Sequence, residues 1–219
     1  MMHAWMTVVR VGCAAAVLAF ARLAPAAPPA VGDAQRGAAH VTSCAACHGA
    51  QGEGNPTAGF PRLAGQTAEY LAAQLRSFTD GSRKSAVMTM LAKSLDAQTQ
   101  LDVAAFYAAA SPPDASDPNA ASDPKQLARG RLLVRVGDES KQLQACANCH
   151  GPDGAGERYA TPYLAGQPAA YLGSAVREWK SGTRSSGARL MGPVAGRLDD
   201  ADIAAVSAYL AHPDQGSGH

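Results

Sequence analysis

The amino-acid sequence contains the pattern Cys-x-x-Cys-His twice, at residues 44–48 and 146–150. This pattern is typical of the covalent attachment of a c-type haem. On a helical turn, two residues between the cysteines let both sulfur atoms reach one edge of a porphyrin, and the histidine that follows points at its centre. Two copies in matching surroundings are much stronger evidence than one. The sequence therefore predicts two haem sites.

Each pair of thiols is predicted to form thioether bonds with haem vinyl groups, and each histidine to be an axial iron ligand. The residues concerned are Cys44, Cys47, His48, Cys146, Cys149 and His150. The fifth cysteine, Cys13, precedes them in a segment that we expect to be removed. We therefore expect two covalently attached haem c groups (iron) as cofactors, with no thiol left for a disulfide or a nucleophile.

The likeness between the two halves extends beyond the haem motifs, which indicates a tandem duplication. The pattern Pro-x-Leu-Ala-Gly-Gln at 61–66 returns at 162–167, and the pattern Gly-x-Arg at 81–83 returns at 182–184. Tyr70, Tyr171, Arg83 and Arg184 also recur at equivalent positions. They are candidates to face the haems or simply to pack the helices, and the sequence leaves both readings open.

The sequence divides into four segments. We predict a signal peptide at 1–27, a first domain at 28–110, a linker at 111–124 and a second domain at 125–219. The first segment has a basic residue, then an apolar run too short for the roughly 20 residues that span a bilayer, then a small-residue cleavage pattern. The third contains four prolines. We therefore expect export to the periplasm.

Helical patterns fill both halves. Apolar spacing and acidic or glycine boundaries predict helices over about 68–80 and 97–109 in the first half, and 169–181 and 199–211 in the second. No convincing strand with a period of two residues appears. The fold is therefore predicted to be all-α, with each half a small helical bundle around its haem.

Methionine is the expected second axial ligand, because Met opposite His raises the potential and suits electron transfer. Met191 is the one methionine after the second haem motif, whereas the first half offers both Met88 and Met90. Counting forward from the Pro-x-Leu-Ala-Gly-Gln repeat aligns Met90 with Met191, and counting backward from the Ala-x-x-Leu segment aligns Met88. We prefer Met88, on a ligand loop that meets the last helix, and keep Met90 as the alternative.

These features together resemble the class I cytochromes c and, in tandem form, the dihaem cytochrome c4 family. The resemblance rests on the repeats above and on Met-x-x-x-Ala-x-x-Leu-Asp segments at 88–96 and 191–199. It implies two tandem cytochrome c-like domains. It also implies that the carbonyls of Pro61 and Pro162 accept hydrogen bonds from the Nδ1–H groups of the two axial histidines.

Electron transfer is the function that this resemblance implies. The chain is interpreted as a periplasmic dihaem cytochrome that carries electrons in a respiratory chain. By resemblance, its donor is a quinol-oxidising complex and its acceptor a terminal oxidase. Peripheral association with the inner membrane is compatible with this reading. A formal net charge of +1 without a clustered basic face argues against nucleic acid as a partner.

The alternative is an electron-accepting cytochrome subunit of a periplasmic dehydrogenase, or a haem enzyme. Dihaem peroxidases and thiosulfate-oxidising cytochromes also carry two Cys-x-x-Cys-His motifs. Catalysis at iron needs an open position or an unusual ligand such as cysteine. Both halves here offer methionine and no spare cysteine, which favours a carrier over an enzyme.

Overall fold

A computed structural model describes most of the 219-residue chain. The described residues are 1, 31–112, 117–118, 120, 123–156 and 161–212. Apart from Met1, the predicted signal peptide lies outside them, and so does much of the predicted linker. Among the described residues, no helix is long and apolar enough to span a membrane.

The first half is built from short helices joined by glycine-rich turns. Its elements are α1 (Ala34–Gly37), η1 (Ala38–His40), α2 (Thr42–His48), α3 (Ala68–Asp80), α4 (Ala86–Lys93) and α5 (Ala97–Ala109). The side chains of Asp33, Thr67 and Asp96 accept hydrogen bonds from backbone N–H groups in the first turns of α1, α3 and α5. These caps satisfy donors that a helix start leaves unpaired, and they fix where each helix begins.

The second half repeats the order of the main helices and adds short elements on both sides of its haem motif. Its elements are α6 (Pro124–Arg135), β1 (Gly137–Asp138), η2 (Glu139–Lys141), β2 (Leu143–Gln144), α7 (Ala147–His150), η3 (Pro152–Gly154), α8 (Ala169–Lys180), α9 (Ala188–Arg197) and α10 (Asp200–Leu210). The all-α prediction is confirmed. The antiparallel pair β1–β2 was not predicted, because strands of two residues are too short to show an alternating pattern.

The predicted helix limits agree closely with the structure. The helices predicted over 68–80 and 97–109 have those bounds in α3 and α5. The helices predicted over 169–181 and 199–211 correspond to α8 and α10, which are slightly shorter than predicted. The methionine segments differ from the expected loop, because they form the helices α4 and α9. Ser85 supplies the missing start signal for α4 by accepting a hydrogen bond from the Met88 N–H at 3.3 Å.

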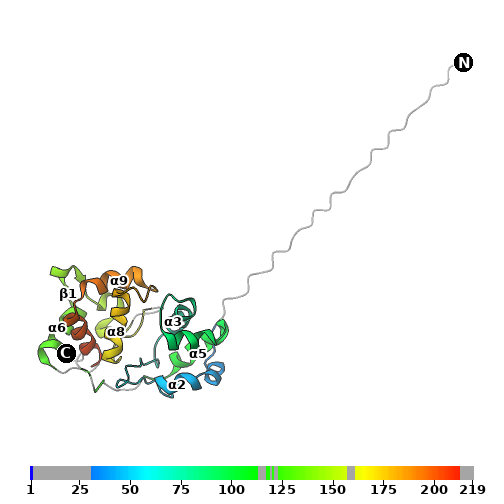
Figure 1. The fold of residues 1–219 in the computed structure, drawn as a ribbon, viewed down its shortest axis with the longest axis horizontal. Coiled ribbons are helices and arrows are strands. Elements are labelled where there is room, and N and C mark those ends of the chain that lie inside the picture. The colour runs from blue at the N-terminus through cyan, green and yellow to red at the C-terminus, as the bar shows by residue number, and fades with distance from the viewer. Residues whose placement is uncertain (2–30, 113–116, 119, 121–122, 157–160, 213–219) are drawn as a thin grey trace.

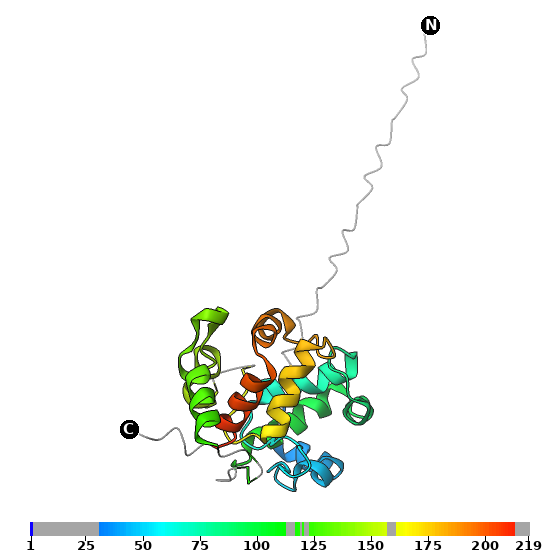
Figure 2. The ribbon, with the colours of Figure 1, turned by 60° about the vertical axis from the view of Figure 1, so that its left-hand side comes forward.

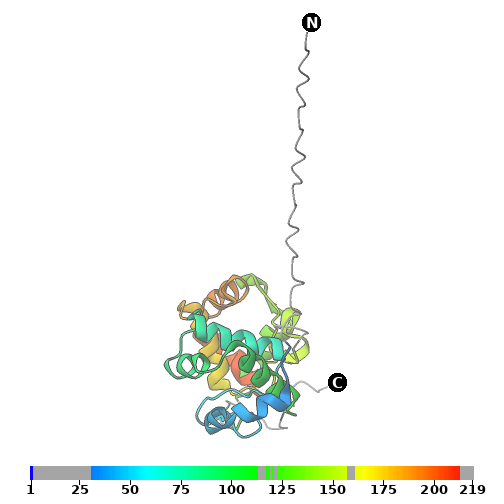
Figure 3. The same cartoon turned by 90° about the vertical axis from the view of Figure 1, so that its right-hand side faces the viewer.

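In each half the helix before the haem motif crosses the last helix. The segment α1–η1 packs on α5, and α6 packs on α10. Figure 2 shows α10 in red between green α6 and yellow α8. Figure 3 turns the first half towards the viewer, with the blue α1–α2 segment beneath the teal and green helices. Each half thus has a core of its own around these crossings.

A glycine lies at the tightest point of each crossing. A Cβ atom on Gly37 would lie 2.1 Å from the Asp102 carbonyl oxygen, and one on Gly130 would lie 2.1 Å from that of Ala205. An arginine and a buried aspartate complete each crossing, with Arg36 Nε 2.8 Å from Asp102 and Arg129 Nε 2.8 Å from Asp202. The hydrogen bond from Arg36 holds the pKa of the Asp102 carboxyl well below its usual range.

We expect Gly130→Ala to destabilise the holoprotein by about 1–3 kcal/mol or more, because the new methyl group has to displace helix backbone. The measurement is urea unfolding followed by circular dichroism. The matched control is Gly196→Ala in α9, where a Cβ meets nothing within 4 Å. It should stabilise the protein by up to about 1 kcal/mol, since alanine is the better helix former. Equal effects of the two substitutions would contradict this account of the crossing.

Candidate functional site

The first haem motif lies on α2, and its geometry follows from the helix. Cys44, Cys47 and His48 lie together on this one short helix, which ends at His48 and is capped by Gly49. His48 is buried at 7% exposure, whereas both cysteines are partly exposed. The helix therefore presents two partly exposed thiols and one buried imidazole.

Both predicted axial histidines are oriented by a proline carbonyl. The distance from His48 Nδ1 to the Pro61 oxygen is 2.8 Å, and that from His150 Nδ1 to the Pro162 oxygen is 3.1 Å. The hydrogen bonds expected from the family resemblance are thus present. When Nδ1 carries the proton and donates to the carbonyl, Nε2 keeps its lone pair, which is the form of imidazole that binds a metal.

Burial also favours the neutral form of both imidazoles. It lowers the pKa of both His48 and His150 below the ordinary value, against a smaller raising effect of the proline carbonyls. Both imidazoles are therefore held neutral. A neutral ring is required for iron binding, since a protonated Nε2 has no lone pair to donate.

The predicted ligands of the first half meet in one cavity of about 460 Å³. Its lining includes Cys44, Cys47, His48 and Met88. Met90 is absent from this lining, and its side chain is 66% exposed. On helix α4 these two methionines point to different sides, as residues two positions apart must.

The walls of this cavity are mainly apolar. They include Leu71, Leu75, Phe78, Leu91, Leu95 and Val103. Aliphatic and aromatic walls of this kind suit a large flat macrocycle better than a hydrated ion. Two thiols, a neutral imidazole and a thioether on such walls have the chemistry to hold a haem. The described residues contain no group of three or more His, Cys, Asp or Glu arranged to hold a metal ion directly.

In the second half, Cys149 and His150 lie in α7 and Cys146 immediately precedes it. Burial raises the pKa of Cys146 to about 11, which disfavours the thiolate form that a zinc site needs. Met191 lies on α9 and is partly buried. The predicted ligands of this half are thus carried by the same two kinds of element as those of the first.

The second half contributes side chains to the first cavity. They include Tyr163, Gln167, Tyr171 and Glu178. Figure 1 shows the two halves side by side, with α3 facing α8. The sequence left Tyr171 open as a candidate to face a haem, whereas Tyr163, Gln167 and Glu178 were not predicted as site residues. Repetition was the only signal available in the sequence, and it marks Gln167 and Tyr171 alone, because Arg62 and Ser77 occupy the positions equivalent to Tyr163 and Glu178.

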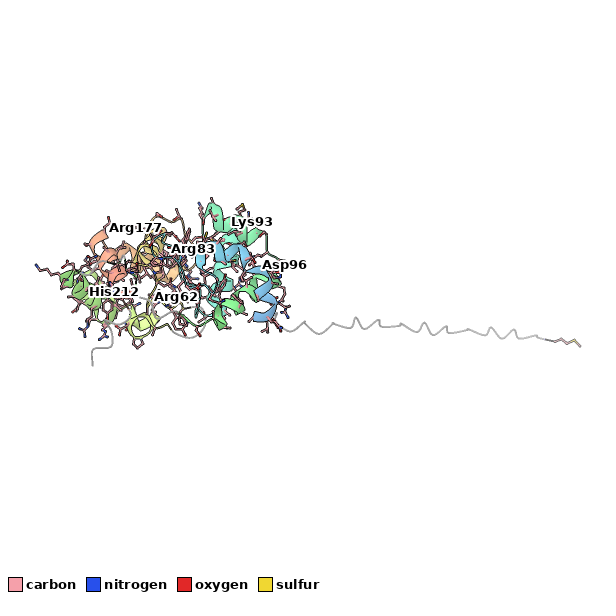
Figure 4. The ribbon with its side chains drawn as sticks, turned by 90° about the horizontal axis from the view of Figure 1, so that it is seen from below. Arg62, Arg83, Lys93, Asp96, Arg177 and His212 are labelled. Carbon is pink, nitrogen blue, oxygen red and sulfur yellow. The ribbon has the colours of Figure 1, made fainter. Side chains whose placement is uncertain are left out.

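The two Gly-x-Arg turns meet each other at the interface between the halves. Arg83 and Arg184 form an antiparallel backbone bridge, and the Lys84 N–H donates to the Thr183 carbonyl at 3.1 Å. Figure 4 places Arg83, and also Arg62, where the first half adjoins the second. The recurring arginines therefore join the two halves. Arg83 also lines the first cavity.

The two arginines have different partners although their positions are equivalent. Arg83 Nε lies 2.9 Å from Glu178, and its side chain is 6% exposed. Both arginines donate to the amide oxygen of Gln74, Arg83 Nη1 at 2.9 Å and Arg184 Nη2 at 2.8 Å, so the difference between them is the carboxylate that Arg83 alone contacts among the described residues. Burial raises the pKa of the neighbouring Tyr70 to about 12, so its phenol stays neutral between the two guanidinium groups. The interface is thus a buried polar cluster with one carboxylate.

Comparison with known proteins agrees with this geometry. The cytochrome c family model matches residues 34–110 and 138–213. The chain is 37% identical to cytochrome c4 of Pseudomonas aeruginosa over 184 residues, which cover 83% of this chain and 89% of that protein. The chain belongs to the dihaem cytochrome c4 family. This cytochrome therefore carries two covalently bound haem c groups and is a dihaem electron carrier.

Two further similarities bear on its role. The crystal structure of reduced recombinant cytochrome c4 from Pseudomonas stutzeri superimposes with a TM-score of 0.75 at 33% identity, covering 83% of this chain and 98% of that one. The thiosulfate dehydrogenase electron acceptor of Thiomonas intermedia is 44% identical over 172 residues, 78% of each chain. The first likeness supports the paired-domain architecture, and the second introduces a particular kind of redox partner.

We expect Glu178→Gln to lower the free energy of unfolding of the holoprotein by about 1.5–3 kcal/mol, because it replaces a charge-assisted hydrogen bond to a buried guanidinium by a neutral one. Urea unfolding measures this. The control is Asp200→Asn, whose side chain is 87% exposed and lies 3.5 Å from Arg177. That change should stay within about 0.5 kcal/mol. A loss for Asp200→Asn as large as that for Glu178→Gln would contradict the importance of the buried pair.

Proposed function

We propose that this cytochrome is exported to the periplasm and carries electrons in a respiratory chain, through two His/Met haems, towards a terminal oxidase. The observation that carries the proposal is the joint placement of His48, Met88 and the two thiols of the first motif around one cavity. Each haem, when bound, supplies an iron that changes between the ferric and ferrous states. The protein supplies attachment, orientation and an apolar enclosure.

The proposed roles are the same in each half. Two cysteines would hold the haem by thioether bonds, and a histidine and a methionine would be the protein ligands of its iron. The residues are Cys44, Cys47, His48 and Met88 in the first half, and Cys146, Cys149, His150 and Met191 in the second. Met88 rather than Met90 is proposed because Met90 is largely exposed. With a histidine and a methionine as ligands, neither iron would have a free position for substrate, so we propose a carrier without catalytic activity of its own.

The proposed domain limits follow the sequence pattern. A signal peptide at 1–27 directs export, domains at 28–110 and 125–219 each hold one haem, and residues 111–124 link them. The family match to 34–110 and 138–213 is compatible with these limits. A periplasmic location fits a quinol-oxidising complex as donor and peripheral contact with the inner membrane.

A second candidate function is that of electron acceptor for a thiosulfate dehydrogenase. The 44% identity to the thiosulfate dehydrogenase electron acceptor of Thiomonas intermedia favours it. The same pair of haems serves both roles, because each role requires only that electrons enter at one haem and leave at the other. The donor, rather than the haem chemistry, distinguishes the two candidates.

We expect Met88→His to convert the first haem to bis-histidine coordination. Its potential falls because imidazole is a stronger electron donor than a thioether, and its iron–sulfur charge-transfer band disappears. Visible spectroscopy and potentiometric titration measure both effects. Met90→His is the matched control on the same helix and should leave both haems unchanged, while Met191→His should act on the second haem. A Met90→His variant that loses the band would show that the assignment is wrong.

Donor specificity is tested by stopped-flow spectroscopy of the oxidised holoprotein. We expect rapid reduction by a quinol-oxidising complex with quinol, and rapid reoxidation by a terminal oxidase. Mixing with thiosulfate and a thiosulfate dehydrogenase tests the second candidate, and rapid reduction by that pair alone would favour it. Thiosulfate or peroxide added without an enzyme should give no turnover. Turnover in that control would argue for a haem enzyme instead.

A further inference from the structure

Two buried glutamines connect the halves of the molecule reciprocally. Gln66 and Gln167 end the two Pro-x-Leu-Ala-Gly-Gln repeats and are 3% and 2% exposed. The Gln167 side chain accepts from the Arg62 N–H at 3.0 Å and donates to the Arg62 carbonyl at 2.8 Å. In the same way, Gln66 accepts from the Tyr163 N–H at 3.1 Å and donates to the Tyr163 carbonyl at 2.6 Å. Each amide thus binds the backbone of the opposite half.

The backbone that each glutamine binds is the one that orients a haem histidine. The Arg62 N–H and the Pro61 carbonyl belong to a single peptide group, and that carbonyl faces His48 Nδ1 at 2.8 Å. A continuous chain of hydrogen bonds therefore runs from His48 through one peptide group to Gln167. The second chain runs from His150 through the Pro162–Tyr163 peptide to Gln66.

We propose that each glutamine is a positioning residue for the axial histidine of the opposite half, so that Gln66 tunes the second haem and Gln167 tunes the first. This inference rests on the proposed assignment of His48 and His150 as iron ligands. It adds a connection between the haems that the ligands themselves do not supply.

The physical basis is cooperativity within a hydrogen-bonded chain. A peptide whose N–H donates to an acceptor has a more negative carbonyl oxygen, which accepts more strongly in turn. A stronger bond at Nδ1–H makes the imidazole a better donor to iron and stabilises the ferric state. Removing the glutamine amide weakens this chain. The potential of the haem in the opposite half then rises.

Burial makes these contacts effective. Both glutamines are almost inaccessible to water, so no solvent molecule competes for the peptide groups and each amide is satisfied at both of its ends. Contacts between the halves at the Gly-x-Arg turns lack this connection. The Ser185 hydroxyl, for example, donates to the Ser82 carbonyl at 3.1 Å, far along the chain from either proline segment.

The test compares Gln66→Met with Gln167→Met in the holoprotein, since methionine keeps the volume and removes both hydrogen bonds. The midpoint potentials are measured by potentiometric titration, and the haems are assigned with Met88→His and Met191→His. Gln66→Met should raise the potential of the second haem, and Gln167→Met that of the first. The expected shift is up to about tenfold in the ferric-to-ferrous ratio at fixed potential, which is about 59 mV for one electron.

Two further variants keep the test decisive. Ser185→Ala removes a hydrogen bond between the halves without contact to a proline segment, and should move neither potential. Gln66→Glu keeps an oxygen acceptor for the Tyr163 N–H, and a carboxylate accepts more strongly than an amide. It should therefore lower the potential of the second haem more than that of the first. It also serves as the test if the methionine variants do not fold.

The crosswise pattern is the distinguishing result. A shift confined to the haem of the substituted half, equal shifts of both haems, or no shift would overturn the inference. A purely structural role at the interface predicts equal shifts, as both halves loosen together. In each of these cases the retained charge-transfer bands of two His/Met haems leave the proposed function intact, whereas their absence from the unsubstituted protein would refute the proposed ligands themselves.

Discussion

The hydrogen bond from an axial histidine ring to a proline carbonyl is the contact on which the site depends. Iron can be held only by a neutral imidazole with Nε2 free, and this contact fixes both the proton and the ring plane. This hydrogen bond forms only if the haem-motif helix and the Pro-x-Leu segment are held in fixed positions relative to each other. In the first half the distance between His48 Nδ1 and the Pro61 oxygen is 2.8 Å. Backbone hydrogen bonds from the Leu63 N–H to the Gly52 carbonyl and from the Gly65 N–H to the Tyr107 carbonyl of α5 hold the Pro-x-Leu segment in place.

The duplicated elements also form the joint between the halves. The Gly-x-Arg turns pair with each other, and the glutamines of the Pro-x-Leu-Ala-Gly-Gln repeats bind each other's segments. Two copies of one domain thus meet through equivalent surfaces, as the subunits of a symmetric dimer do. Because these contacts are buried and polar, each requires its partner, and separation of the halves would leave several groups unsatisfied.

The two halves are not fully equivalent at their interface. Glu178 pairs with Arg83, whereas Ser77 occupies the equivalent position in the first half and offers Arg184 no carboxylate; both arginines share the neutral Gln74. Glu178 also lines the first cavity. The first cavity is therefore lined by an ion pair between Arg83 and Glu178, one from each half, and this feature arises at the interface rather than within either domain.

The sequence by itself determined the local features of this cytochrome. The haem motifs, the duplication and the ends of α3 and α5 follow from spacing and from capping residues, which act over a few positions of the chain. Tertiary structure decided what depends on long-range contacts. Both Met88 and Met90 satisfied the local pattern, and only the packing of α4 turns Met88 into the cavity and leaves Met90 exposed. The roles of Gln66 and Gln167 likewise depend on partners about a hundred residues away, because hydrogen bonds between the halves exist only once both domains have folded and docked.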